Sequence, residues 1–303
     1  MGAKPTLLLT GAGGLVGSAL YRAFLGSFRV VAQVHQRSLR TRIRRGDRVV
    51  RCDLRTAGAA SSLVESAEPE LIVHLAALSS LSACAKDPVL ATAVNTDLSR
   101  ELAAAAHSTG AYLLFASTDQ VFDGDGAPYG ERDRTSPISV YGRTKAEAED
   151  AVLEACLEAL VMRFSLVLSP AADGESGALE MLAAAHQRRA ELRLFIDEHR
   201  TPISILDLGR QIEHALRTRA SGVFHAGGME RVDRMQLGRR IAEVFGWHDA
   251  VLVGASRKDS QPARPADLSL VSGRLVPEGW PRPKPLDEAL REMKSEPLLL
   301  GSG

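Results

Sequence analysis

The sequence predicts an α/β fold in which a parallel β-sheet is covered by helices on both faces. Two observations carry this prediction. Short, continuously apolar segments alternate with Ala- and Glu-rich helical patterns through the first two-thirds of the chain, and a glycine-rich turn directly follows the first apolar segment. Strands that are apolar throughout must be buried on both faces, and intervening helices make such strands parallel. We therefore expect a doubly wound, Rossmann-type sheet with right-handed crossovers.

Six strands and three helices are expected in this part of the chain. The strands are the short apolar runs Thr6–Thr10, Arg29–Val34, Arg48–Cys52, Glu70–Leu75, Ala111–Ala116 and Ala159–Phe164. The helices are the longer segments whose apolar residues recur at helical spacing, namely Leu15–Leu25, Ala91–Ser108 and Val140–Cys156.

The pattern changes after about residue 165, which indicates a smaller mixed α/β domain. Its expected elements are helices over Ala178–Arg189, Asp207–Thr218 and Arg234–Phe245 and short strands near Leu192–Ile196 and Gly222–His225. Residues 255–285 are rich in Pro, Arg and Ser and are expected to be irregular. We expect one domain over residues 1–165, with a contribution from about 198–225, and a second mainly over 166–303.

Composition excludes several classes of protein. The 303 residues include 37 Lys and Arg against 37 Asp and Glu, so the formal net charge is zero, which argues against a nucleic-acid binder. No apolar run approaches the ~20 residues of a membrane span. The three cysteines are odd in number, far apart and without metal-site spacing, which favours free thiols in a reducing cytoplasm and no bound metal.

The glycine-rich turn matches a dinucleotide-binding loop. Gly11, Gly14 and Gly17 follow the first strand and open the first helix, as that fingerprint requires. The first glycine permits the tight turn, the second lets the backbone approach a pyrophosphate, and the third allows the helix to pack closely on the sheet. The helix begins with Leu15 and Val16, whose unpaired N–H groups and positive dipole end suit the phosphates.

The end of the second strand favours NADP over NAD, although NAD is not excluded. NAD sites usually place a carboxylate there for the ribose 2′-hydroxyl, but the chain has no acidic residue before Asp47. His35 and Arg37 would instead face a 2′-phosphate, which arginine binds bidentately. After the third strand, Asp53 can accept a hydrogen bond from the adenine amino group while Leu54 covers the ring. A nearly as good local interpretation makes Asp53 a helix N-cap.

The end of the fourth strand completes the expected cofactor site. Ala76, Ala77 and Leu78 follow that strand where a dinucleotide would cross the sheet, and the first two leave room for it. The preceding His74 has no partner motif, and we interpret it as a core histidine.

The most specific signal is a hydroxyl residue combined with a Tyr–Lys pair. Thr118 ends the fifth strand, at the edge where ligands bind in such sheets, and Tyr141 and Lys145 lie four apart on one helical face. The lysine ammonium would lower the pKa of the phenol and hold the nicotinamide ribose, so that the tyrosine exchanges a proton with a carbonyl or alcohol. The threonine hydroxyl would orient the same substrate oxygen.

Together these residues resemble the extended short-chain dehydrogenase/reductase family over nearly the whole chain. Within it, the likeness is to the dTDP-4-dehydrorhamnose reductase group. That likeness is carried by the segments Ser117–Gly124, Thr135–Pro137, Arg200–Ser204 with Asp207, and Arg264–Leu270.

The resemblance implies an oxidoreductase in which NADPH delivers hydride to C4 of a nucleotide-linked 4-keto-6-deoxy sugar. Thr118, Tyr141 and Lys145 would be catalytic, and Asp119, Gln120 and Arg264 would contact the substrate. An equally good interpretation of Arg264 is that it packs the two domains together. Two departures lie on the substrate side and leave the identity of the sugar open. The group usually has Tyr where Gln120 stands, and the loop Leu78–Cys84 lacks the acidic residues expected there.

Two other functions stay open. The same group is similar to the regulatory subunit of methionine adenosyltransferase, which binds NADP without turnover, and sugar-nucleotide epimerases share the fold. The intact triad favours an enzyme over the regulatory role. An exposed face of the helix that carries Tyr141 offers a surface for a homodimer.

Overall fold

The computed structural model describes residues 4–24, 26–39, 41–170 and 177–296, and its centre is a fully parallel seven-stranded sheet. The strand order is β11-β6-β5-β4-β1-β2-β3. From β1 the chain first adds β2 and β3 on one side and then β4, β5, β6 and β11 on the other, which is the arrangement of a doubly wound fold. The strands are β1 (Thr6–Thr10), β2 (Arg29–Val34), β3 (Arg48–Arg51), β4 (Leu71–His74), β5 (Tyr112–Thr118), β6 (Leu160–Phe164) and β11 (Gly222–Ala226). The predicted fold class is confirmed.

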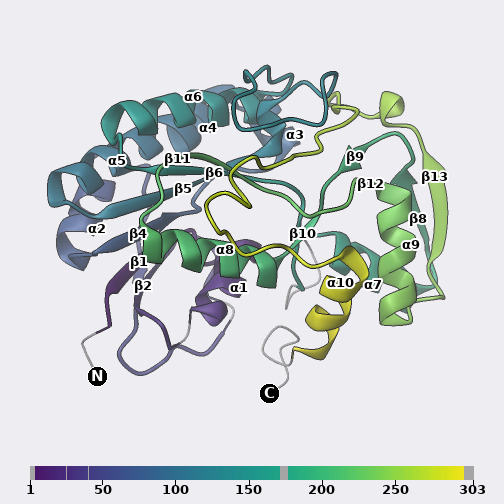
Figure 1. The fold of residues 1–303 in the computed structure, drawn as a ribbon, viewed down its shortest axis with the longest axis horizontal. Helices are drawn as coiled ribbons and strands as arrows, with labels where there is room; N and C mark the ends of the chain where they lie inside the picture. The colour runs from purple at the N-terminus through teal and green to yellow at the C-terminus, as the bar shows by residue number, and fades with distance from the viewer. Residues whose placement is uncertain (1–3, 25, 40, 171–176, 297–303) are drawn as a thin grey trace.

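Helices cover both faces of the sheet, as Figure 1 shows. On β1, Leu7 and Leu9 point into the core beneath α1 and α8, while Leu8 points into the core on the opposite face, and all three are fully buried. This two-sided burial explains why the strand is apolar at every position. The first pair of helices is α1 (Leu15–Ala23) and α8 (Ile205–Thr218), and the opposite layer is α2 (Ala59–Ala67), α5 (Leu98–Thr109) and α6 (Val140–Ala155).

The helix expected over Ala91–Ser108 is interrupted. The chain forms α4 (Pro88–Thr92), then one π-helical turn over Ala93–Asp97, and only then α5. The helices α2, α3 (Leu81–Lys86) and α10 (Leu286–Ser295) were not expected. The first two are short and rich in Ser and Ala, so their apolar spacing is too brief to be recognised. The first helix ends at Ala23, and Leu25, the expected end, lies outside the described residues.

The second part of the chain forms a smaller lobe beside the sheet (Figure 1). Its strands are β8 (Glu191–Phe195) paired in parallel with β13 (Val251–Ala255), β9 (His199–Arg200) paired with β12 (Val232–Asp233), and β7 (Val167–Leu168) paired with β10 (Ile203–Ser204). Its helices are α7 (Ala178–Arg188), α9 (Arg234–Phe245) and α10. Between these elements the chain returns once to the main sheet, where β11 pairs with β6.

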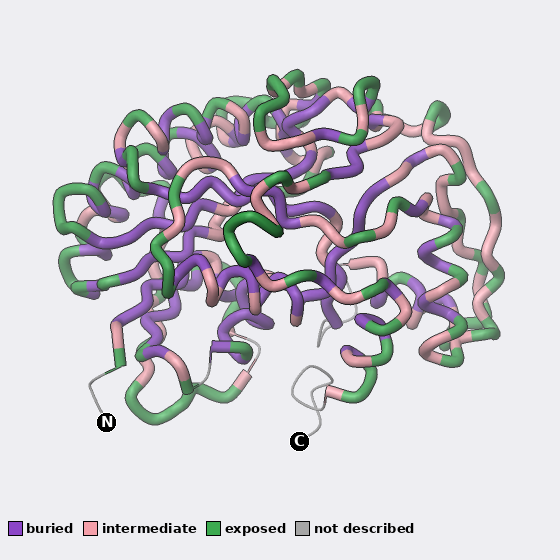
Figure 2. The backbone as a smooth tube through the Cα atoms, in the orientation of Figure 1, coloured by how far each residue is buried: buried purple, intermediate pink, exposed green. Residues whose placement is uncertain are grey.

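A C-terminal segment connects the lobe to the loop that follows β5. Tyr129 donates a backbone hydrogen bond to Ser269, and Val271 donates one to Tyr129, over 2.8 Å each. Leu268 and Leu270 pack against Phe122 in a small separate core. In Figure 2 the central strands of the sheet are buried, whereas the outer faces of the helices are exposed. The segment therefore fixes the lobe against the carboxyl ends of the strands.

Within the described ranges, no helix has the length and apolar character to cross a membrane.

Candidate active site

The glycine-rich loop has the geometry of a phosphate cradle. Gly11 has a φ of +68°, and a Cβ atom there would lie 2.7 Å from the backbone nitrogen of Ala76. A Cβ on Gly17 would clash with the carbonyl oxygen of Gly11, so the helix reaches its close position only with glycine. Gly14 is the N-cap of α1 and no side chain caps the helix there. The first N–H groups of the helix, at Leu15 and Val16, are therefore directed at the space where an anion would bind.

Gly13, which the sequence did not single out, fits the loop against the end of β2. A Cβ atom on Gly13 would clash with the carbonyl oxygen of Arg37. Gln33, on β2, accepts a hydrogen bond from the backbone nitrogen of Gly11 and donates one to the carbonyl of Cys52, both over 2.9 Å. These contacts fix the phosphate loop to the turn that carries Arg37.

The expected 2′-phosphate region is strongly basic. Arg51 donates hydrogen bonds to the carbonyl oxygens of His35 and Gln36 and to the Ser38 hydroxyl, and so shapes the loop after β2. In the described part of the chain, the exposed Arg37 side chain has no hydrogen bond or ion pair. The loop thus presents a guanidinium that no neighbouring carboxylate neutralises.

Asp53 does not cap a helix, since the N-cap of α2 is Gly58. Its carboxylate instead receives a bidentate pair of hydrogen bonds from Arg55, with the shortest contact at 2.5 Å, and lies 3.4 Å from Nε2 of His35. The hydrogen bonds from Arg55 hold the pKa of Asp53 well below its usual range. The neighbouring Leu54 is buried in the core on that face of the sheet. The proposed contacts of Asp53 and Leu54 with adenine stay predictions.

The loop after β4 is held by a residue that the sequence analysis missed. Asn95, in the π-helical turn, accepts a hydrogen bond from the backbone nitrogen of Leu78 over 2.8 Å and donates to its carbonyl over 3.1 Å. Its amide also donates to the Thr144 hydroxyl over 2.9 Å, which links this loop to the helix of the Tyr–Lys pair. The turn therefore fixes Ala76, Ala77 and Leu78 beside the glycine loop. A π-helical turn often marks a functional site, but a single such turn cannot be recognised from the spacing of apolar residues.

His74, at the end of the same strand, is a core histidine. Its Nδ1 lies 2.7 Å from the Thr10 hydroxyl and its Nε2 lies 3.1 Å from the Ser99 hydroxyl. Burial and the charge of Lys145 lower the pKa of His74 to about 3. The ring is therefore neutral and fully hydrogen-bonded.

The structure brings Thr118, Tyr141 and Lys145 together at the carboxyl edge of the sheet. Thr118 ends β5, and its hydroxyl lies close enough to the Tyr141 phenol to lower the pKa of that group. Tyr141 and Lys145 lie in the first turns of α6, which Ser139 caps by accepting a hydrogen bond from the nitrogen of Gly142. A Cβ atom on Gly142 would clash with the carbonyl oxygen of Gln120, so this glycine brings the tyrosine close to the strand end.

Burial sets the protonation of both helix residues. It raises the pKa of Tyr141 above its ordinary value, although the Thr118 hydroxyl opposes this effect. The direction is opposite to the sequence-based expectation, because desolvation of the phenolate dominates here. Burial also lowers the pKa of Lys145 to about 7, and the charge of Glu149 limits that fall. Tyr141 is thus a protonated phenol at neutral pH, beside an amine poised to change charge.

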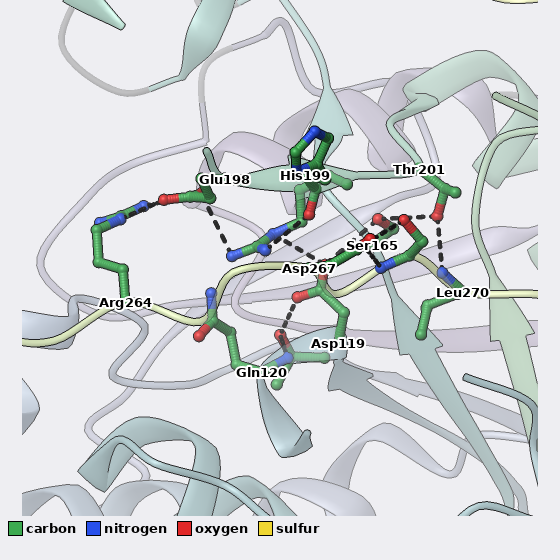
Figure 3. A network of polar contacts seen from close by, with 12 residues as sticks. Asp119, Gln120, Ser165, Glu198, His199, Thr201, Arg264, Asp267 and Leu270 are labelled. Atoms are coloured by element: carbon green, nitrogen blue, oxygen red, sulfur yellow. Dashed lines mark hydrogen bonds and ion pairs between the residues drawn. The ribbon is translucent and has the colours of Figure 1, made fainter. Parts of the chain in front are cut away.

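Asp119 and Arg264 belong to a buried polar cluster beside the triad, shown in Figure 3. Glu198, which has no exposed surface, accepts hydrogen bonds from Arg264 over 2.5 Å and from Arg234 over 2.8 Å, and lies 3.3 Å from Arg200. Arg200 also lies 3.3 Å from the Asp119 carboxylate. We call these five residues the arginine cluster.

The arginine cluster carries excess positive charge. Its three guanidinium groups face two carboxylates, and burial raises the pKa of Asp119 toward the neutral form. The hydrogen bond from Arg264 and the charges of Arg234 and Arg200 outweigh the burial of Glu198 and hold its pKa at about 2. Next to the cluster, the buried Oε1 atom of Gln120 has no hydrogen-bond partner in the described part of the molecule. The cluster suits an anionic ligand with a polar group near Gln120.

Comparison with known proteins places the chain in a family. It is 30% identical over 266 residues to methionine adenosyltransferase 2 subunit beta from Bos taurus, covering 83% of this chain and 78% of that protein. It is 35% identical over 201 residues to dTDP-4-dehydrorhamnose reductase from Sinorhizobium fredii, covering 64% and 67% respectively.

The fold comparison agrees. The crystal structure of dTDP-4-dehydrorhamnose reductase from Bacillus anthracis in complex with NADP superimposes with a TM-score of 0.82, at 20% identity, over 97% of this chain and 100% of that one. The family model of the RmlD substrate binding domain matches residues 5–297. The chain therefore belongs to the RmlD substrate binding domain family, within the extended short-chain dehydrogenases/reductases.

Proposed function

We propose that the protein is an NADPH-dependent reductase of a nucleotide-linked 4-keto-6-deoxy sugar. The observation that carries the proposal is the juxtaposition of Thr118 with the Tyr141–Lys145 face of α6, next to an uncapped, glycine-lined helix N-terminus. A proton donor and a dinucleotide cradle at one sheet edge are what carbonyl reduction requires. A relative in Sinorhizobium fredii is named for such a reaction.

The residues present fit NADP. Gly11 and Gly17 have no room for a Cβ atom, so the phosphate loop packs there through backbone atoms alone. The first turn of α1 carries no acidic residue that would repel a phosphate. Arg37 supplies the charge for a 2′-phosphate. We assign the cofactor to residues 1–165 together with about 198–225, and the substrate mainly to the remainder of 166–303. The NADP complex of the Bacillus anthracis enzyme supports this assignment.

The mechanism follows from the protonation states. When bound, reduced nicotinamide supplies a hydride to the keto carbon. Tyr141 donates its phenolic proton to the carbonyl oxygen, which becomes the product hydroxyl, while Thr118 donates a hydrogen bond that orients this oxygen. The raised pKa of Tyr141 keeps its proton in place until that step. The Lys145 ammonium then stabilises the tyrosinate that remains.

The arginine cluster indicates that the substrate is an anion rather than an uncharged ketone. A nucleotide diphosphate brings two or more negative charges, which would balance the excess of guanidinium groups around Glu198. Arg264, only partly buried, is the member placed to turn toward such a ligand, with Gln120 beside it. Asp119 is already paired with Arg200, so we propose that it holds Thr118 in position. A direct contact of Asp119 with the sugar stays a prediction.

A thermal-shift titration tests the substrate class. A ligand that binds only the folded state raises its melting temperature, by an amount that depends on its affinity. With NADPH present, we expect further stabilisation by dTDP and little by UDP or GDP. Equal effects of all three nucleotides, or none, would contradict a dTDP-linked substrate.

A non-catalytic, NADP-binding regulatory role is the second candidate, because the chain is also similar to methionine adenosyltransferase 2 subunit beta. It predicts a stoichiometric enzyme partner and no turnover on keto sugars. Epimerisation, a third possibility on the same fold, would interconvert two sugars without net consumption of NADPH. Measuring NADPH consumption with a keto sugar therefore separates the reductase from the other two functions, which differ in whether one sugar is converted into another or a stoichiometric enzyme partner binds.

A further inference from the structure

Glu149 lies behind the Tyr–Lys pair on the same face of α6. It follows Lys145 by four residues and is 3% exposed. Arg163 on β6, itself 5% exposed, binds both carboxylate oxygens from Nε over 3.0 and 3.1 Å and from its terminal nitrogen over 2.6 Å. Ser117, the residue before Thr118, also donates a hydrogen bond to the carboxylate. Glu149 is thus fixed by β5 and β6 at once.

Arg163 is itself held by an uncharged partner. Its other terminal nitrogen lies 3.2 Å from Nε2 of His225 on β11. Nδ1 of His225 lies 3.1 Å from the carbonyl oxygens of Tyr129 and of Val271, so Nδ1 carries the proton and Nε2 accepts from Arg163. Burial and the charge of Arg163 lower the pKa of His225 to about 4. The buried pair of Arg163 and Glu149 is therefore electrically balanced without His225.

Lys145 has little else to hold its charge. Its Nζ lies 3.8 Å from the centre of the Phe115 ring, and the residue is 2% exposed. Nowhere in the described ranges does this ammonium form a hydrogen bond or an ion pair. The titratable or charged groups around it are His74 from β4 and Tyr141 on its own helix, which are both uncharged, Glu149 one turn further along that helix, and Arg163 behind that carboxylate. Glu149 is the one that favours the ammonium.

We propose that Glu149 is a positioning residue, which Arg163 and Ser117 clamp so that its charge keeps the neighbouring Lys145 an ammonium beneath Tyr141. The role rests on the proposed function, since it matters for catalysis only if Lys145 supports the proton donor. It concerns a carboxylate that touches neither substrate nor cofactor. The arrangement explains why a buried ion pair, which contributes little to stability by itself, lies directly behind the triad.

NMR titration of the lysine side chains tests the proposal without any substrate. The sequence contains only six lysines, at positions 4, 86, 145, 258, 284 and 294. Protein carrying ¹³C at the lysine ε-carbons therefore gives few signals, and the one missing in Lys145→Met belongs to Lys145. In Glu149→Gln we expect the pKa of Lys145 to fall by about 1 or more, the usual effect of a nearby opposite charge. Glu147→Gln, on the exposed face of α6, should leave it unchanged.

A double variant separates this role from fold maintenance. Glu149→Gln alone leaves the Arg163 charge buried and unpaired, which destabilises the protein and also repels Lys145. In Glu149→Gln with Arg163→Met, we expect the melting temperature to recover while the pKa of Lys145 stays below that of the wild type. A return of both to wild-type values would overturn the proposal, as would an unchanged pKa in either variant. If the single variant does not fold, the double variant decides alone.

The activity profile provides a second readout. The alkaline limb of kcat/KM should move to lower pH in the double variant, in step with the pKa measured by NMR. Absence of any reductase activity in the wild type would contradict the proposed function, whereas the NMR result would still test the role of Glu149.

Discussion

Arg264 donates a 2.5 Å hydrogen bond from Nε to Oε2 of Glu198, although the two residues are 66 positions apart in the sequence. The same carboxylate binds Arg234 from α9 and lies against Arg200 from β9. One fully buried glutamate therefore joins three segments of the lobe at the substrate side of the sheet. This relationship makes Glu198 both a structural centre and the counter-charge that a bound anion would supplement.

Replacement of Glu198 by Gln should destabilise the protein strongly. It leaves buried guanidinium groups without their counter-charge, a change that typically costs about 3–5 kcal/mol. Urea unfolding would measure the loss. Asp97→Asn is a matched control, because it breaks the exposed pair of Asp97 with Arg100 and should cost less than about 1 kcal/mol. A similarly small loss in both variants would contradict the counter-charge role.

Protonation of the Glu198 carboxylate should contribute to the unfolding of the wild-type protein in acid. The pKa of Glu198 is about 2 in the folded protein and about 4.3 in an unfolded chain. Its stabilising effect is therefore complete above pH ~4.3 and is lost as the pH falls toward 2. Glu198→Gln should show a shallower loss of stability over that interval, measured as the melting temperature against pH. Parallel curves for the two proteins would speak against a depressed pKa.

Arg37→Ala should weaken the binding of NADPH much more than that of NADH. A hydrogen bond to a charged group contributes about 1.5–3 kcal/mol, which corresponds to roughly a tenfold or larger loss of NADPH affinity. Fluorescence titration measures both dissociation constants. Arg45→Ala removes an exposed arginine from the same loop and should change neither. Equal losses of both cofactors would mean that Arg37 does not read the 2′-phosphate.

Two alanine substitutions should separate the roles of neighbouring glycines. Gly13→Ala forces a Cβ atom against the carbonyl of Arg37, so it should lower the melting temperature and weaken NADPH binding preferentially by displacing that turn. In Gly14→Ala the nearest atom to the new Cβ is 3.3 Å away, the oxygen of Gly11. That variant should stay closer to wild-type stability but weaken both cofactors alike. Identical behaviour of the two variants would contradict this division.

The sequence predicts the elements that depend on local patterns. The strands of the main sheet, the glycine turn and the Tyr141–Lys145 helix face all follow from apolar runs and short spacings, and the structure has them within a few residues. The interruption at Asn95 was missed because one π-helical turn hardly changes the apolar spacing of the helices on either side. Gly13 was missed because its constraint comes from a separate strand end.

The arginine cluster could not be predicted from local sequence patterns. Glu198, Arg234 and Arg264 occupy a strand connection, a helix start and an irregular segment, and nothing in their spacing shows that they meet. The same holds for Arg163 and Glu149, which β6 and α6 bring together. The pKa of Tyr141 also depended on burial, which outweighs the local charge that the sequence suggested. Tertiary packing decides each of these features.

Tyr141→Phe should abolish most of the catalysis without loss of fold. Removal of a positioned general acid typically lowers kcat by roughly 10²–10⁴-fold. The dissociation constant of NADPH and the melting temperature should stay close to those of the wild type, because the ring is retained. A variant with full activity would show that another group donates the proton.

The most direct test of the central claim is the rate at which wild-type protein oxidises NADPH in the presence of dTDP-4-dehydrorhamnose. The account predicts turnover, with one reduced sugar formed for each NADPH consumed and with almost none in Tyr141→Phe. No consumption of NADPH by folded, NADPH-binding wild-type protein, with this or other nucleotide-linked 4-keto sugars, would contradict it.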